Sequence, residues 1–397
     1  MAAFLLDNDL IPLRPIGVTG TNGKTSISQW LTQALTLLGE KPCLIGTNGN
    51  GFWGNLESTT FTTPEAVLLQ SILHRYIKQG ASSLVMEVSS HGLSQHRVAG
   101  IPFLIGVFTN LTRDHLDYHG DMEAYYQAKK QLFLSPSMGY AIIHIDDPYG
   151  KRLSNELKKE RPELEILGYG VNKQAHIHLH TVNESQEGIE LNLTSPWGDI
   201  QLFHPHLIGF FNAQNLAASF AVLCVLGFEA SLSAKILSGI KPAKGRMQVL
   251  KEKGKPLVII DYAHTPDALQ KALTVLKPAA QAGKLYCVFG CGGNRDQGKR
   301  SLMGQVVEET ADYAVVTSDN PRDEDPIEII ADIIKNIHPK IVETDRKKAI
   351  QWAIEQANEG DVVLIAGKGH ENYQEIKGTR YPFDEDEIAL HYLKDKQ

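Results

Sequence analysis

A glycine-rich turn near the start of the chain constrains the fold more than any other segment. Residues 20–25, Gly-Thr-Asn-Gly-Lys-Thr, follow an apolar run at 15–19 and precede a helical pattern that begins at Ser26. A strand, a glycine turn and a helix in this order present backbone N–H groups and the positive end of the helix dipole to phosphate oxygens. Lys24 is then expected to reach the terminal phosphates of a nucleotide, and Thr25 to ligate Mg²⁺.

The spacing within this turn leaves a second interpretation open. The general phosphate-loop pattern has four residues between its first glycine and the Gly-Lys pair. Here two residues separate Gly20 from Gly23. A glycine turn that only caps a helix, with Lys24 in solvent, is the alternative.

Strand and helix patterns alternate through the first part of the chain. Apolar strands are expected at 16–19, 43–46, 84–88, 104–109 and 141–145, with helices over 26–38 and 122–134 among the intervening segments. Such alternation predicts a mostly parallel sheet covered by helices. Residues 175–204 alternate in short runs and predict a small antiparallel flank, whose histidines need not bind metal. A long helix is expected over 213–226.

A second α/β series follows a stretch rich in Gly, Pro and charge at 239–246. Its strands are expected at 257–261, 285–290, 314–317 and 362–366, each followed by a polar turn. Ligands of open α/β sheets bind at these carboxyl ends. We therefore predict two domains facing each other across a cleft: a phosphate-loop domain over 1–240, with a mostly parallel sheet and the antiparallel flank, and a Rossmann-like α/β domain over 241–397.

Composition limits the classes of function. The chain has 397 residues, 42% of them hydrophobic and 21% charged, with a net charge of −7. That charge argues against a nucleic-acid partner held by phosphate contacts. No apolar run is long enough to cross a bilayer, no signal peptide is recognisable, and the four cysteines are expected to be reduced. We expect a cytoplasmic monomer that acts on small molecules.

Ionisable side chains cluster after strands of the first series. Glu87 ends a buried strand, where a second Mg²⁺ ligand of a nucleotide site would lie, although a helix-capping acid is the simpler alternative. His115 lies in a charged turn over 110–119 and could bind metal or orient a phosphate. Lys129 and Lys130 lie on a predicted helix, where lysines usually form a solvated face.

The second series carries polar turns of its own. Asp261 and His264 follow a strand and suit contact with Mg²⁺ or phosphate, although Thr265 before Pro266 also reads as a helix start. Three later turns contain Arg295, residues 319–322 and residues 367–371. Arginines that pair with a carboxylate and a glutamate that pairs with an ammonium predict a pocket for a small zwitterion.

Together these motifs resemble the Mur ligase family, the ATP-dependent amide ligases of peptidoglycan synthesis. The resemblance extends over nearly the whole chain from Ile16. It rests on residues 20–25, 87–91, 110–120, 212–215, 245–246, 261–266, 319–322 and 367–371. It implies ATP and Mg²⁺ as cofactors, catalysis by domain closure and a cytoplasmic role in cell-wall synthesis.

The resemblance also implies roles for individual residues. Lys129 matches a carbamylated lysine that would ligate a second Mg²⁺ with His115, which overturns the surface-lysine interpretation. Four residues are implied in catalysis: Lys24, Glu87, His115 and Lys129. The implied metal ligands are Thr25, Glu87, His115 and carbamylated Lys129. The implied ATP site comprises Gly20, Thr21, Asn22, Gly23, Lys24, Thr25, Ser26, Asn215, Arg246, Asp261 and His264.

Two further sets concern the other substrates. The residues implied to hold a UDP-muramoyl-dipeptide are Thr62, Thr63, Ser89, Gln95 and Arg97. Those implied to hold meso-diaminopimelate are Arg295, Asp319, Asn320, Pro321, Arg322, Gly367 and Glu371. The turn at 319–322 is the family's marker for meso-diaminopimelate, whose second carboxylate an arginine can neutralise.

The implied reaction adds meso-diaminopimelate to UDP-N-acetylmuramoyl-L-alanyl-D-glutamate through an acyl-phosphate. Another ligase of the same fold, such as a folylpolyglutamate synthase or a cyanophycin-type ligase, is one alternative, although the turn at 319–322 argues against both. A non-catalytic nucleotide-binding module is the other alternative.

The front of the chain departs from the family's pattern. Ligases that add the third residue of the stem peptide carry an N-terminal domain for the uridine diphosphate, and residues 1–15 are too few to form one. We expect either a truncated chain or uridine recognition that is lost or supplied elsewhere.

Overall fold

The computed structural model describes residues 13–59, 61–185, 187–280 and 283–396, and it divides into two compact units. The first unit holds residues up to Asn183 together with Glu190–His204 and Phe210–Lys241. The second holds Glu184–Ile189, Pro205–Gly209 and Pro242 to the C-terminus. Most of the segment 1–15, which we expected to be too short for a domain, lies outside the described residues.

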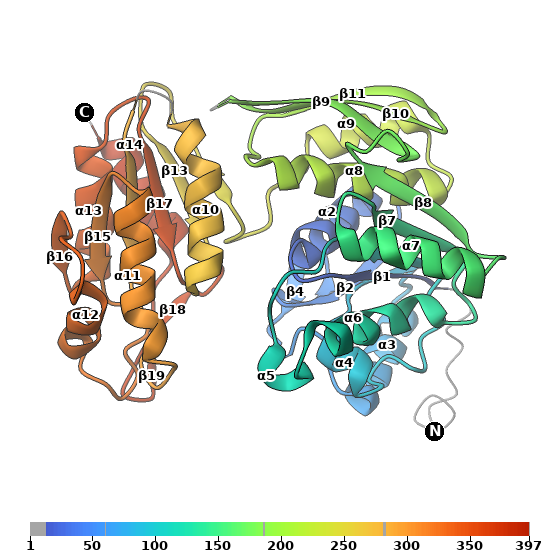
Figure 1. Ribbon diagram of the computed structural model, residues 1–397, viewed down its shortest axis with the longest axis horizontal. Coiled ribbons are helices and arrows are strands. Elements are labelled where there is room, and N and C mark those ends of the chain that lie inside the picture. Colours follow the sequence, from blue (N-terminus) through green and yellow to red (C-terminus); the bar gives the residue numbers. More distant parts are fainter. Residues whose placement is uncertain (1–12, 60, 186, 281–282, 397) are drawn as a thin grey trace. The chain divides into compact units, whose positions relative to one another are not determined.

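An 11-stranded sheet forms the centre of the first unit, in the order β11-β10-β9-β8-β7-β6-β1-β5-β2-β3-β4 (Figure 1). Strand β1 lies between β5 and β6 and runs parallel to both. The strands are β1 (Arg14–Thr19), β2 (Pro42–Gly46), β3 (Gly49–Phe52), β4 (Asn55–Glu57), β5 (Ser83–Glu87), β6 (Ile105–Phe108), β7 (Tyr140–His144), β8 (Glu165–Gly170), β9 (Ile177–Ser185), β10 (Gly188–Ser195) and β11 (Gly198–His204).

Helices cover this sheet because its inner strands are apolar on both faces. All residues of β2, β5 and β6 are buried, as parallel strands between helical layers require. The helices are α2 (Lys24–Leu37), α3 (Ala66–Lys78), α4 (Ser90–Ser94), α5 (Leu116–His119), α6 (Met122–Lys130), α7 (Pro148–Glu160), α8 (Phe210–Val225) and α9 (Ala230–Ser238), with a 3₁₀ turn η1 (Gln131–Leu134) after α6.

The second unit contains a six-stranded sheet in the order β12-β13-β17-β14-β15-β16. Strand β12 is antiparallel to β13, and the other neighbours are parallel. Its strands are β12 (Gln248–Leu250), β13 (Leu257–Asp261), β14 (Leu285–Phe289), β15 (Tyr313–Thr317), β16 (Ile341–Glu343) and β17 (Val362–Ala366), and a separate hairpin joins β18 (Tyr373–Ile376) to β19 (Thr379–Pro382).

Two apolar clusters lie against this second sheet. One contains side chains of α10 (Pro266–Ala279), α11 (Gly298–Thr310) and α12 (Pro326–Ile334). The other contains side chains of α13 (Arg346–Gln356) and α14 (Glu385–Asp395). Strand β17 contributes Leu364 to the first cluster and Ile365 to the second, so alternate residues of this central strand serve both faces.

The predicted fold class is confirmed, with differences at element edges. The antiparallel flank is the continuation of the main sheet through β9, β10 and β11. The helix predicted over 122–134 is α-helical only to Lys130 and ends in the 3₁₀ turn. Across the described part of the chain, no helix is long and apolar enough to cross a membrane. All four cysteines are free and buried.

Candidate active site

The glycine turn after β1 requires glycine at two positions because other residues press against it. Gly20 has φ +145°, and a Cβ atom there would lie 1.8 Å from Oγ1 of Thr109. Gly23, which caps α2 in the left-handed region at φ +87°, would place a Cβ 2.7 Å from Oδ1 of Asn215. The loop is therefore packed between the end of β6 and helix α8, and a side chain at either position would displace it.

The segment after β6 fixes the shape of the loop. The carbonyl of Asn110 accepts from the N–H of Thr21 at 2.9 Å, and its Oδ1 accepts from the N–H of Asn22 at 3.0 Å. The hydroxyl of Thr109 donates to the carbonyl of Asn22 at 2.5 Å. Asn110 belonged to a motif visible in the sequence, whereas nothing in the pattern identified Thr109.

Glu87 lies at the end of β5 and faces the first turn of α2. Its Oε2 accepts from the hydroxyl of Thr25 at 2.9 Å and from that of Thr47 at 3.0 Å, and its Oε1 accepts from the N–H of Thr47 at 2.8 Å. Sequence reasoning paired Thr25 with Glu87 and missed Thr47, which follows β2 by one residue. The carboxylate is buried, 1% exposed, and held by three donors.

Two lysines converge on the glycine turn. Nζ of Lys24 donates to the carbonyls of Gly20 and Thr21, both at 2.9 Å, and Nζ of Lys129 donates to the same Gly20 carbonyl at 2.8 Å. Lys129 is 1% exposed, and its amine lies 4.6 Å from the centre of the Tyr125 ring. The solvated-face interpretation of this lysine and of Lys130, 7% exposed, is therefore wrong.

Electrostatics favour the neutral form of Lys129. Burial lowers the pKa of its amine well below the usual range, and the charge of Lys24 adds to that effect. A neutral amine is the form that can react with CO₂, whereas an ammonium group has no lone pair to do so.

His115 directly precedes α5 as its N-cap residue and belongs to a group of aromatic rings. Its ring centre lies 4.9 Å from that of His91 and 6.0 Å from that of Tyr125. Burial lowers the pKa of the His115 imidazole, although the Asp114 carboxylate opposes this shift. The neutral imidazole, which is the form that binds metal, is thereby favoured.

The donor atoms fit one Mg²⁺ better than two. Thr25 and Glu87 bring a hydroxyl and a carboxylate together, which are hard oxygen ligands of the kind Mg²⁺ takes beside phosphates. Lys129, with its amine on a carbonyl, cannot ligate metal without modification. Among the described residues, no group of three or more His, Cys, Asp and Glu side chains is placed to hold a metal ion.

The five residues implied to hold the muramoyl-dipeptide fall into one hydrogen-bonded region. Thr63 donates to the carbonyl of Glu87 at 2.9 Å and accepts from the N–H of Ser89 at 3.0 Å. Arg97 donates to the carbonyl of Thr63 and, through Nε, to Oε1 of Gln95, both at 2.8 Å. Thr62 is also tied to this region, since its hydroxyl lies 3.1 Å from that of Thr47.

Asn215, to which the resemblance gives the adenine contact, lies on α8 close to Gly23 of the glycine turn. It is buried, and its amide donates to Oδ1 of Asn212 at 3.4 Å. Gln214 lies between these two residues in the sequence, and its side-chain Nε2 is 2.8 Å from Nε2 of His144, the last residue of β7. The sequence analysis gave Gln214 no role of its own within the 212–215 motif, and it did not identify His144.

In the second unit, Arg246, Asp261 and His264 share one region at the end of β13. Asp261 accepts from the N–H groups of Met247 and Ala263 at 2.8 and 2.9 Å, and burial raises the pKa of its carboxyl. The guanidinium of Arg246 lies 5.0 Å from the ring centre of Tyr262. His264 is exposed, and its Nδ1 lies 2.8 Å from the carbonyl of Tyr262.

The turns after β15 and β17 meet at the same edge of the second sheet. Asn320 donates to Oε2 of Glu371 at 2.8 Å and accepts from the buried amine of Lys368 at 2.9 Å. A Cβ at Gly367, with φ +122°, would lie 2.6 Å from Oδ2 of Asp319. Pro321 is also buried in this edge.

Arg322 connects this group to the turn after β14. It has φ +51°, donates through Nη1 to the carbonyl of Gly293 at 2.7 Å, and lies 3.5 Å from the Glu375 carboxylate. Arg295 is exposed on that turn, and a Cβ at Gly292 would lie within 4 Å of both arginines. The structure thus brings Asn320, Arg322 and their neighbours together and leaves Arg295 in solvent at the rim.

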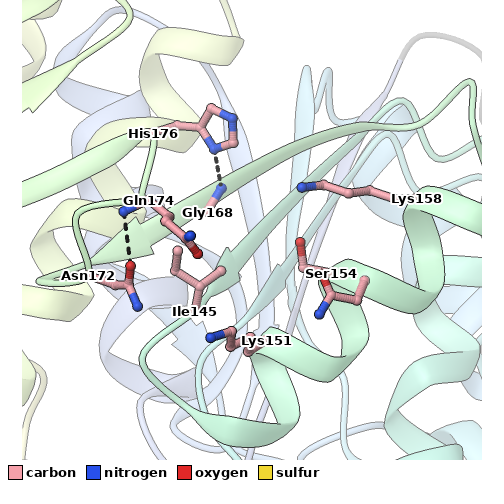
Figure 2. Close-up of a pocket in the computed structure, with 9 residues that line it drawn as sticks. Ile145, Lys151, Ser154, Lys158, Gly168, Asn172, Gln174 and His176 are labelled. Atoms are coloured by element: carbon pink, nitrogen blue, oxygen red, sulfur yellow. Dashed lines mark hydrogen bonds between the residues drawn. The ribbon is translucent and has the colours of Figure 1, made fainter.

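A separate pocket lies on the first unit, between α7 and the segment that joins β8 to β9 (Figure 2). None of the predicted site residues lines it. Its lining comprises Ile145, Lys151, Ser154, Asn155, Lys158, Gly168, Asn172, Gln174 and His176. His176, from the predicted flank, accepts the N–H of Gly168 through Nδ1 at 3.0 Å, as Figure 2 shows, and so has a structural contact.

Two α/β units, with a glycine turn after β1 of the first and polar turns at the strand ends of the second, are the architecture of an ATP-dependent ligase of the Mur type, and the chain belongs to the Mur ligase family. The model of the Mur ligase middle domain matches residues 18–223, and that of the Mur ligase glutamate ligase domain matches residues 245–369.

Particular relatives bear a more specific name. The chain is 52% identical to the UDP-N-acetylmuramoyl-L-alanyl-D-glutamate--2,6-diaminopimelate ligase of Neisseria meningitidis serogroup A, over 98% of this chain and 79% of that protein. A solved structure of a ligase with the same name is 40% identical, with a TM-score of 0.75 over 99% of this chain and 81% of the other.

A folylpolyglutamate synthase of Mycobacterium tuberculosis, solved with ADP and AMPPCP, shares the fold. Its identity is 19% and its TM-score is 0.72, over 92% of this chain and 91% of the other.

Proposed function

We propose that the protein is an ATP-dependent amide ligase that joins meso-diaminopimelate to UDP-N-acetylmuramoyl-L-alanyl-D-glutamate. The observation that carries the proposal is Arg322, held in a left-handed conformation two residues after Asn320, which is itself hydrogen-bonded to Glu371. A guanidinium there suits the extra carboxylate of meso-diaminopimelate, which lysine lacks. Relatives that are 50–52% identical to the chain and bear the name of this ligase support the same substrate pair.

The reaction follows from two displacements. An oxygen of the D-glutamate γ-carboxylate attacks the γ-phosphorus of ATP, and the bond to ADP breaks to leave an acyl-phosphate. The amine of meso-diaminopimelate then attacks the acyl carbon, a proton leaves the nitrogen, and the carbon–oxygen bond breaks to release phosphate. Lys24 and the backbone N–H groups of the glycine turn would stabilise the charge on the transferred phosphoryl group.

Mg²⁺ would supply further charge neutralisation at the phosphates. Thr25 and Glu87 would hold one ion. His115 and Lys129 would hold a second only if Lys129 is carbamylated, a step in which its neutral amine adds to CO₂ and releases one proton. The burial that lowers the pKa of this amine supports the modification.

The remaining assignments follow the same division. We assign the ATP contacts of the first unit to residues 20–26 and Asn215, and those of the second unit to Arg246, Asp261 and His264. The muramoyl-dipeptide would be held by Thr62, Thr63, Ser89, Gln95 and Arg97. The amino acid would be held by the turns that contain Arg295, residues 319–322, Gly367 and Glu371. We further propose that the protein acts as a cytoplasmic monomer, which size-exclusion chromatography with light scattering would test.

A phosphate-release assay tests the proposed reaction. Protein, ATP and Mg²⁺ are combined with UDP-muramoyl-dipeptide and either meso-diaminopimelate or L-lysine. We expect phosphate release and amide product only with meso-diaminopimelate. Equal turnover with lysine would contradict the role of Arg322, and turnover with a folate and glutamate instead would assign the chain to the folylpolyglutamate synthase alternative.

A further inference from the structure

One buried arginine contacts both strands whose turns carry the proposed amino-acid pocket. Arg346, the first residue of α13, is 1% exposed. Its Nη1 donates to the carbonyl of Ser318 at 3.3 Å, and its Nη2 to that of Ala366 at 2.8 Å. Ser318 precedes Asp319 directly, and Ala366 precedes Gly367. The guanidinium therefore spans the two points at which the pocket residues leave the sheet.

Glu385 fixes the third side of this guanidinium. Its Oε1 accepts from Nε of Arg346 at 2.6 Å, and both side chains are 0% exposed. Glu385 is the first residue of α14, so the carboxylate is also near the positive end of that helix. A buried ion pair with both partners anchored on helix starts holds its geometry more tightly than a surface pair, because neither side chain is free to move into water.

The distance between the ends of β15 and β17 determines, through the two turns, where the pocket residues lie. Asp319 lies against Gly367 so closely that no side chain fits there. Beyond them, Asn320 and Glu371 share the buried amine of Lys368, at 2.9 and 3.2 Å. A change in the separation of the ends of β15 and β17 would therefore move Asn320 relative to Glu371.

We propose that Arg346, held by Glu385, is a positioning residue of the amino-acid pocket. It sets the spacing of the turns at 319–322 and 367–371 without touching the substrate, and thereby sets the affinity for the incoming amino acid. This inference rests on the proposed function, since it names a determinant of the same site. Only a planar fork reaches both carbonyls while it pairs with the carboxylate, so lysine cannot replace this arginine.

Steady-state kinetics of R346K test the proposal. We expect the KM for meso-diaminopimelate to rise roughly tenfold or more, with the KM values for ATP and UDP-muramoyl-dipeptide changed less than about twofold. The matched control is D361N, at the opposite end of β17. Asp361 is 6% exposed and accepts from the N–H groups of Lys284 and Asn358, both at 2.7 Å. This control is expected to lower Tm and leave all KM values unchanged.

A second variant guards against loss of folding. R346M/E385M replaces the ion pair by apolar side chains, a change that folded proteins commonly tolerate. It is expected to fold and to show the same raised KM for the amino acid. A KM that is unchanged in both variants, or one that rises equally for all three substrates, overturns the proposal.

A readout without turnover separates this inference from the proposed reaction. In ¹H–¹⁵N spectra of the protein, R346K is expected to shift the amide signals of Asn320 and Gly367, and D361N is not. If the wild-type protein releases no phosphate with meso-diaminopimelate, the proposed function fails, and these spectra still decide whether Arg346 positions the turns. Unshifted signals in R346K would reject that role.

Discussion

The amine of Lys129 donates a hydrogen bond to the carbonyl oxygen of Gly20 at 2.8 Å, although the two residues are 109 positions apart. Helix α6 thus places a buried amine directly beneath the phosphate loop. The same carbonyl accepts from Lys24 at 2.9 Å, so two lysines share one acceptor. Burial lowers the pKa of the Lys129 amine, and repulsion from the Lys24 ammonium adds to this effect, so loss of a proton from Lys129 is favoured.

Lys129→Ala is expected to lower kcat by about 100-fold or more, because it removes the group that would carry the carbamate and complete a second Mg²⁺ site. Added formate or acetate should restore part of the activity, since a short carboxylate can occupy the space of the carbamate. Phosphate release measured with and without these anions checks the prediction.

The neighbouring lysine supplies the control. Lys130 pairs with Glu156 at 2.8 Å and Glu160 at 2.7 Å, away from the loop. Lys130→Ala should cost about 1 kcal/mol of stability and leave kcat unchanged. Full activity of Lys129→Ala in CO₂-depleted buffer without any added anion would exclude the carbamate.

Thr47→Val is expected to raise the Mg²⁺ concentration that half-maximal activity requires and to lower kcat/KM roughly tenfold. The change removes the hydroxyl that donates to Oε2 of Glu87 at 3.0 Å and leaves the carboxylate with less support. Thr47→Ser keeps the hydroxyl and should behave like the wild type. Titration of activity with Mg²⁺ measures the effect, and equal titration curves for the valine and serine variants would remove Thr47 from the site.

Thr47 also shows why part of the site could not be read from the sequence. The strands of the sheets could be predicted from the sequence, because they contain apolar runs such as 257–260 and 362–366. The predicted strands 257–261 and 362–366 match β13 and β17 residue for residue. The turns that end these strands could be located for the same reason. Thr47 lies 40 positions from Glu87, and no local pattern indicates that a crossover between β2 and β5 brings them together.

The burial of some charged side chains also could not be predicted from the sequence. The residues around Lys129 have the polar pattern of an exposed helix, and only tertiary packing beneath the glycine turn makes the residue 1% exposed. Arg346 was missed for a related reason. It lies at a helix start among Lys347 and Lys348, where a third cation looks like part of a solvated surface, while the structure buries it completely.

Arg322→Ala is expected to raise the KM for meso-diaminopimelate about 100-fold, because a carboxylate of the substrate would lose a charge-assisted, paired contact. The KM for ATP should stay within about twofold of the wild-type value. The control is Arg380→Ala in the hairpin of β18 and β19, where the guanidinium lies 4.3 Å from the ring centre of Tyr373. An unchanged apparent affinity of Arg322→Ala for the amino acid would refute the assignment.

His370 is expected to make the second unit sensitive to acid. Burial, together with the nearby charges of Arg246 and Lys244, lowers the pKa of its imidazole to about 4. Because the unfolded chain has the ordinary histidine pKa of about 6.5, it binds more protons than the folded chain between pH 6.5 and pH 4. The contribution of His370 to the free energy of unfolding is therefore fully present above pH 6.5 and is lost as the pH falls through that window. The loss is about 2 kcal/mol after allowance for partial exposure.

His370→Gln should remove this part of the acid loss, because glutamine does not titrate. Urea unfolding at several pH values between 7 and 4 measures the difference between the variant and the wild type. His338→Gln is the matched control, since the side chain of His338 is 97% exposed in the same unit, and its removal should leave the pH dependence unchanged. If both variants lose stability with acid as steeply as the wild type, the protonation of His370 does not contribute, and the loss belongs to other groups of the unit.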